Sequence, residues 1–130
     1  MTVPTVATYS AAALIAAHTS FKNLIDAGSG AGSIKIRDAS DVLLAQVALS
    51  DPCGTVNGTT GQLVFSIAGP DASADASGTA AYGEFCDSDG LVHLSLPAET
   101  GTAPVSGKIV FNSRSILSGG TVEVVSASIG

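Results

Sequence analysis

Residues 72–90 read ASADASGTAAYGEFCDSDG and contain three successive structural signals. A loop of small residues comes first, a run of strand-forming residues over 79–86 follows, and Asp87-Ser88-Asp89-Gly90 ends the stretch. Gly90 can adopt the positive φ that a hairpin loop of about three to five residues requires. We therefore expect a strand that turns back on itself at residues 87–90, which indicates antiparallel β structure.

The same two-residue periodicity extends outward from this stretch in both directions. Ile34 and Ile36, for example, alternate with Lys35 and Arg37, which is the pattern of a half-buried strand. Asp51-Pro52 is expected to close the second strand. The expected strands are 33–37, 42–49, 62–68, 79–86, 91–96, 105–111, 115–117 and 121–129. Their spacing predicts a mainly β fold, an antiparallel jelly-roll-like β-sandwich of seven or eight strands with one N-terminal α-helix.

The segment before the first strand has helical periodicity instead. Ser10 is placed as the N-cap of a helix that runs to about Asp26. Gly28 can provide the left-handed residue that ends it. One face carries apolar spacing at Leu14, Ala17, His18, Phe21 and Ile25. The predicted organisation is an extended N-terminal arm over residues 1–10 and a single β-sandwich domain with its leading helix over 11–130.

Composition restricts the class of protein further. The 130 residues suit one domain, and 45% of them are hydrophobic while only 12% are charged. This small share of charged residues favours a surface that is covered by other protein chains. Five Lys and Arg oppose eleven Asp and Glu, a net charge of −6, and no basic run is present, so nucleic acid is not an expected partner. The sequence shows no signal peptide and no membrane span, so no membrane partner is expected either.

Two features resemble metal sites, and each has a simpler interpretation. Asp87-Ser88-Asp89-Gly90 looks like the start of a calcium loop, yet the position that needs a bidentate Glu is Ala98. The hairpin turn is therefore favoured. Zinc needs three or four converging ligands, and His18 and His93 lack suitably spaced partners. His18 is expected to be a hydrogen-bonded residue at the core margin, and His93 a solvent-facing residue on its strand.

No motif for catalysis or cofactor binding emerges. Cys53 and Cys86 form no metal or redox motif and are expected to be buried free thiols, with a mutual disulfide left open. The glycines of 28–32 follow a helix, whereas a phosphate-binding loop precedes one. The serines lack a nucleophile-elbow sequence, the glutamates are only Glu84, Glu99 and Glu123, and the tyrosines are only Tyr9 and Tyr82. We assign no catalytic, cofactor-binding or metal residue, and we do not expect an enzyme.

Four segments taken together resemble a known family. They are NLIDAGSGAG at 23–32, LLA at 43–45 with LSDP at 49–52, ADASGTA at 74–80 with DSDG at 87–90, and NSRSILSGGTV at 112–122. In this order they are similar to small proteins encoded in the structural gene clusters of tailed phages and prophages. The similarity runs from about residue 11 to the end, and residues 1–10 match no segment of that family.

This resemblance implies a virion component, most plausibly a capsid decoration or cement protein. It implies that the partner is the major capsid protein, that the chain self-associates as a dimer or trimer, and that it lies on the capsid exterior after assembly in the host cytoplasm. Contacts are expected from residues 1–9 and from loops at 53–61, 69–78 and 97–104. Two alternatives stay open: a tail or fibre-associated module that binds host surface glycans, and a small hydrolase on a β-sandwich.

Overall fold

The computed structural model describes residues 8–130, so most of the expected arm, residues 1–7, lies outside the described residues. One helix precedes all the strands: α1 spans Ala11–Asp26. Ser10 is its N-cap, as expected, and the Ser10 hydroxyl accepts a hydrogen bond from the Ala13 amide. Gly28 follows the helix with a φ of 106°, which confirms its expected left-handed conformation.

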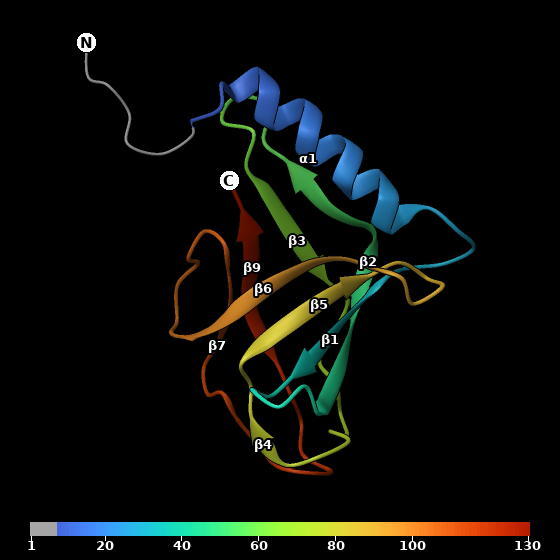
Figure 1. Ribbon diagram of the computed structural model, residues 1–130, viewed down its shortest axis with the longest axis vertical. Coiled ribbons are helices and arrows are strands. Elements are labelled where there is room, and N and C mark those ends of the chain that lie inside the picture. Colours follow the sequence, from blue (N-terminus) through green and yellow to red (C-terminus); the bar gives the residue numbers. More distant parts are fainter. Residues whose placement is uncertain (1–7) are drawn as a thin grey trace.

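Nine strands follow α1 within the described residues, which confirms the mainly β fold with a leading helix (Figure 1). Their bounds are β1 Ser33–Arg37, β2 Leu43–Val56, β3 Leu63–Ile67, β4 Gly78–Thr79, β5 Tyr82–Cys86, β6 Val92–Thr100, β7 Lys108–Phe111, β8 Ser115–Ile116 and β9 Val124–Ile129. Within residues 8–130, no helix is both long and apolar enough to cross a membrane.

Seven of these strands close into a barrel in the order β1-β2-β3-β9-β7-β6-β5, and β5 pairs with β1 to complete the ring. All pairs are antiparallel except β6 with β7, which run parallel with Ala98 beside Ile109. A closed barrel thus takes the place of the expected antiparallel jelly-roll-like sandwich. The reason is this parallel pair, because it joins two strands that a sandwich of two open sheets would leave apart.

Several strand limits differ from those expected. β2 continues through the cis Asp51-Pro52 bond to Val56, because Pro52 lies where the β2–β3 register shifts and so interrupts no regular ladder. β6 continues past Pro97 because residues 98–100 pair with β7. The expected strand 79–86 is divided into β4 and β5, and β4 leaves the barrel to pair with β8. The expected strands 105–111 and 121–129 begin later, at Lys108 and Val124.

The core fills the barrel and extends under the helix. Phe65 and Phe85 stack inside with ring centroids 4.4 Å apart, and Phe21 of α1 meets Phe65 edge-on at 6.4 Å. Ile25, also on α1, is fully buried. Figure 1 shows α1 lying across one end of the molecule and β4 at the other end. The helix therefore covers the barrel through most of the predicted apolar face, although Ala17 of that face is exposed.

Gly83 is packed closely against the side chains of the interior. A Cβ at this position would lie 2.3 Å from Ile109 Cδ1 and 2.9 Å from Ile34 Cγ2. Both isoleucines are fully buried, so neither can swing into solvent to make room. A side chain at residue 83 would have to displace packed core atoms.

We expect Gly83→Ala to lower the free energy of unfolding by about 1–3 kcal/mol through overpacking. Chemical denaturation of the two proteins measures this. Gly58→Ala is the matched control, because a Cβ there meets no atom within 4 Å. Equal stability of Gly83→Ala and the parent chain would contradict this description of the core.

Candidate functional site

A polar cluster lies on the outer surface of β1 and β5. Arg37 ends β1 opposite Tyr82 of β5, and the Arg37 guanidinium forms an ion pair with Glu84. Arg37 also donates to the Asp41 carbonyl at 3.0 Å, and the Tyr82 hydroxyl donates to Asp41 Oδ1 at 2.6 Å. The period-two pattern aims these side chains outward, and the β1–β5 register brings them together.

The charged and polar groups of this cluster are paired with one another. The hydrogen bond to Asp41 raises the pKa of Tyr82 to about 12, which keeps its phenol protonated. The hydrogen bond to Glu84 raises the pKa of Arg37. A catalytic group needs a pKa near the working pH, and neither shift moves a group in that direction. The cluster therefore holds two strands and a turn together and lacks the features of a general acid or base.

The turn at residues 87–90 is the hairpin turn that the sequence predicts. Asp87 Oδ1 accepts hydrogen bonds from the amides of Asp89 and Leu91, both at 3.0 Å, and Gly90 has a φ of 86°. Asp38 makes the same pattern with the amides of Ser40 and Val42. Each aspartate fixes its own hairpin turn.

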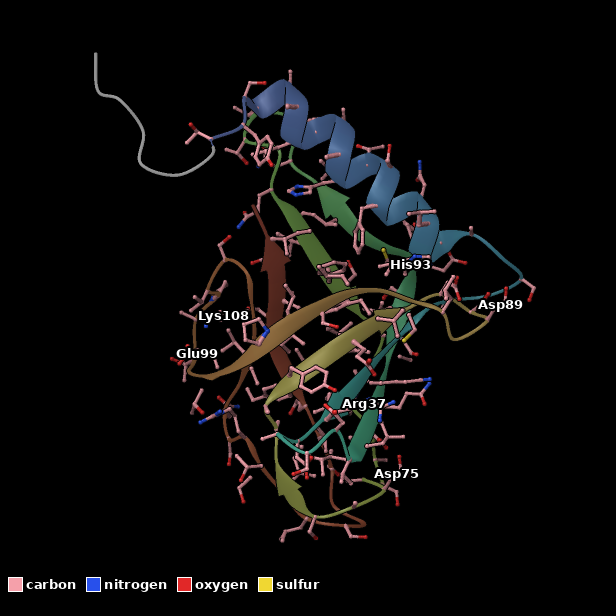
Figure 2. The ribbon with its side chains drawn as sticks, in the orientation of Figure 1. Arg37, Asp75, Asp89, His93, Glu99 and Lys108 are labelled. Carbon is pink, nitrogen blue, oxygen red and sulfur yellow. The ribbon has the colours of Figure 1, made fainter. Side chains whose placement is uncertain are left out.

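His93 is not the solvent-facing residue that we expected. Its Nε2 lies 3.0 Å from Asp87 Oδ2, and its side chain is only 14% exposed. The reason is the hairpin, which brings residue 93 back beside the turn. Figure 2 shows His93 and Asp89 near the C-terminal end of α1, far from Asp75. The partnership with His93 and the amides of Leu91 and Asp89 lowers the pKa of Asp87.

A shallow depression of about 420 Å³ lies beside this turn. Its polar side chains are those of Lys35, Gln46, Ser33, Asp87, Ser88 and Asp89. Gln46 and Ser33 hydrogen bond to each other at 3.1 Å. The lining includes no aromatic residue and no cysteine or histidine. It can accommodate a small polar group, but it lacks the stacking surface of a typical sugar site and a nucleophile paired with a base.

His18 is where we expected it, at the core margin. Its Nδ1 lies 2.6 Å from the Gly61 carbonyl, which links α1 to the loop between β2 and β3. The two histidines lie apart with different partners, and no group of three or more His, Cys, Asp or Glu able to hold a metal is present in residues 8–130. Neither histidine hydrogen bonds to a serine in the same range, so no catalytic triad is assembled.

The cysteines are both free and buried, as expected. Cys53 lies beside the end of α1, where its amide donates to Asp26 Oδ1 at 2.7 Å. Lys22 pairs with the other oxygen of Asp26 at 2.9 Å, so Asp26 joins the helix to β2. Burial raises the pKa of the Cys53 thiol to about 12 and also raises the pKa of Cys86, so neither is an activated thiol.

The glycines of residues 28–32 serve packing. A Cβ on Gly32 would lie 2.3 Å from the Cys86 carbonyl oxygen and 2.7 Å from Ile25 Cγ2. The segment leads from α1 into β1, so its amides do not begin a helix and do not form a phosphate cradle. This agrees with the interpretation from sequence.

The segments expected to contact neighbours differ in their limits from those predicted, and the contacts themselves stay a prediction. Residues 1–7 lie outside the described residues, while Tyr9 is 70% exposed. The expected loop 53–61 is a loop only from residue 57, because residues 53–56 belong to β2. The expected loop 97–104 likewise begins after Thr100, where β6 ends. Residues 69–77 do connect β3 to β4 outside the named strands.

Comparisons of this chain with family models, with curated proteins and with solved structures find no match.

We expect both thiols to resist a water-soluble aromatic disulfide reagent in the folded protein at about pH 8, because a thiolate is needed for the reaction. Absorbance of the released product should show two thiols only after denaturation. Ser20→Cys provides the control, since residue 20 is exposed on α1 and should add one thiol that reacts at once. Rapid reaction of two thiols in the folded parent would contradict the described burial.

The lowered pKa of Asp87 predicts a specific loss of stability in acid. The folded chain binds this proton more weakly than the unfolded chain, whose carboxyl has the ordinary value of 3.8. The stabilisation is therefore complete above pH 3.8 and is lost as the pH falls through the lower folded value. Asp87→Asn should lower the Tm at pH 7, and the difference from the parent should narrow below pH 3.8.

The control for this experiment is Asp89→Asn, whose carboxylate accepts no hydrogen bond from the residues that the structure describes. It should leave the Tm nearly unchanged at every pH. A Tm difference between Asp87→Asn and the parent that is the same at pH 7 and at about pH 2.5 would show that ionisation of Asp87 is not the cause.

Proposed function

We propose that this protein is a virion structural protein, a capsid decoration or cement protein that binds and stabilises the major capsid protein lattice of a tailed phage from outside. One observation carries the proposal beyond the sequence resemblance. Only 12% of the residues are charged, and the described surface also exposes several large apolar side chains, a combination that suits burial against other chains. The exposed large apolar side chains are those of Tyr9, Leu24, Val42, Val64, Leu91, Val92, Val105 and Leu117.

The barrel restricts how such contacts form. Each of the seven barrel strands has neighbours on both sides, which leaves only short unpaired stretches for strand addition. A cement protein could bind by pairing a strand with the edge of a neighbour's sheet. We do not propose this kind of contact for the barrel strands. Contact is assigned to side chains on turns and loops, such as Leu91 after the Asp87 turn and Leu117 after β8, which are 63% and 72% exposed.

Repetition makes weak contacts sufficient. Copies bound at equivalent positions of a capsid lattice, and to one another as dimers or trimers at its symmetry axes, add their small binding energies. The described residues supply no catalytic constellation, which supports a role in binding. The alternative, a tail or fibre-associated module that binds host surface glycans, has less support because the 420 Å³ depression has no aromatic lining.

The copy number of this chain in purified particles tests the proposal. We expect a number comparable to that of the major capsid protein, measured by quantitative mass spectrometry of particles that encode the chain. A few copies per particle would overturn the cement role and favour the tail or fibre alternative. Absence from the particle would overturn both.

A second experiment tests the assigned surface. Leu91→Asp and Leu117→Asp should each reduce the occupancy of capsids that lack the native protein, measured by sedimentation with the capsid. Thr19→Asp is the matched control, since it adds the same charge at an exposed position of α1. If all three variants bind like the parent, the apolar side chains are not the contacts.

A further inference from the structure

The loop between β2 and β3 holds one asparagine side chain in a defined set of hydrogen bonds. Asn57 Oδ1 accepts hydrogen bonds from two successive backbone amides, Thr59 at 2.7 Å and Thr60 at 2.9 Å. The main chain of Asn57 is fixed as well, because its amide donates to Gln62 at 2.8 Å and its carbonyl accepts from Gly61 at 2.9 Å. The carboxamide is thus held with its oxygen facing two donors.

The next residue leaves this carboxamide open to attack from the chain itself. Gly58 has no side chain, and a Cβ there would meet no atom within 4 Å. Both Asn57 and Gly58 are exposed, so water and hydroxide reach them. The Gly58 nitrogen is bonded to the carbonyl carbon of Asn57, which makes any reaction between this nitrogen and the side-chain carbon Cγ intramolecular.

We propose that Asn57-Gly58 is a site of spontaneous covalent modification, deamidation through a cyclic imide. Hydroxide removes the proton from the Gly58 amide, and the nitrogen forms a bond to Asn57 Cγ. The bond from Cγ to Nδ2 of Asn57 then breaks. Nδ2 takes a proton from water and leaves as ammonia. Water then opens the imide at either carbonyl and leaves an aspartate or an isoaspartate at position 57. No oxidant or cofactor takes part.

The amides of Thr59 and Thr60 accelerate the first step. Attack on Cγ places negative charge on Oδ1, and the two N–H groups already point at that atom at hydrogen-bonding distance. This is the arrangement of an oxyanion hole, which stabilises charge as it develops because its donors need no reorganisation. An unfolded chain has the same Asn-Gly sequence but lacks this arrangement.

The modification alters the attachment of the helix. An isoaspartate carries the main chain through Cβ, which displaces the carbonyl that accepts from Gly61. Gly61 in turn accepts from His18 of α1, and a Cβ on Gly61 would lie 2.5 Å from Leu14 Cβ. The site of modification is therefore linked to α1 through Gly61, and the new carboxylate adds one negative charge to this loop.

The test compares deamidation rates in the folded and the denatured full-length chain at the same pH and temperature. Peptide mass spectrometry detects the mass increase at residue 57, and a methyltransferase specific for isoaspartate detects the rearranged product. We expect Asn57 to react faster in the folded chain, faster at higher pH, and far faster than Asn23 or Asn112 in the same sample. A folded rate equal to or below the denatured rate would overturn the proposal.

Three variants separate the causes. Thr59→Pro removes one amide donor and should slow the folded reaction by about tenfold or more, given losses of roughly 10²–10³ when enzymes lose an oxyanion donor. Thr59→Ala keeps the amide and should react like the parent, so equal rates for Thr59→Pro and Thr59→Ala would contradict the role of the amides. Gly58→Ala should slow the reaction in both folded and denatured chains, and an unchanged rate would exclude attack by the residue 58 nitrogen.

Discussion

The parallel pairing of β6 with β7 is the constraint on which the rest of the structure depends. Ala98, Glu99 and Thr100 lie beside Ile109, Val110 and Phe111, and this short ladder joins the two ends of an otherwise antiparallel sheet. Closure gives every barrel strand two partners and creates an interior that only side chains can fill. The Phe65–Phe85 pair, the contact of Gly83 with Ile109 and the helix above them all follow from that enclosed space.

Closure of the barrel also separates the apolar side chains inside it from the charged side chains outside it. The apolar residues that alternate along each strand turn inward, so the few charged residues gather on the outer surface and on turns, where they pair locally. Arg37 with Glu84 and Lys22 with Asp26 are the ion pairs of the described residues, and His93 hydrogen bonds to Asp87. Partly exposed pairs of this kind contribute little stability individually, and their main effect is to fix a turn, a strand pair and the end of the helix.

The sequence predicts local structure here much better than long-range pairing. The helix limits, β1, β3 and the Asp87 turn follow from caps, alternation and turn residues, which act over a few positions. The parallel β6–β7 pair could not be predicted, because alternation along a strand is the same whichever way its neighbour runs. The sequence also did not reveal that His93 contacts Asp87 or that Arg37 contacts Glu84. Both contacts depend on the register between paired strands, which alternation does not specify. Asp38 and Asn57 had a visible signal in their turn-forming sequences.

The position of β9 between β3 and β7 has a consequence for synthesis. The barrel cannot close until residues 124–129 have left the ribosome, so β3 and β7 each lack a partner while the chain is being made. Closure of the whole ring therefore waits for the last of the described strands, and it depends on contacts between residues far apart in the chain, which form slowly. During that interval the unpaired strands are open to association with other nascent chains, and this is the stage at which a chaperone would act.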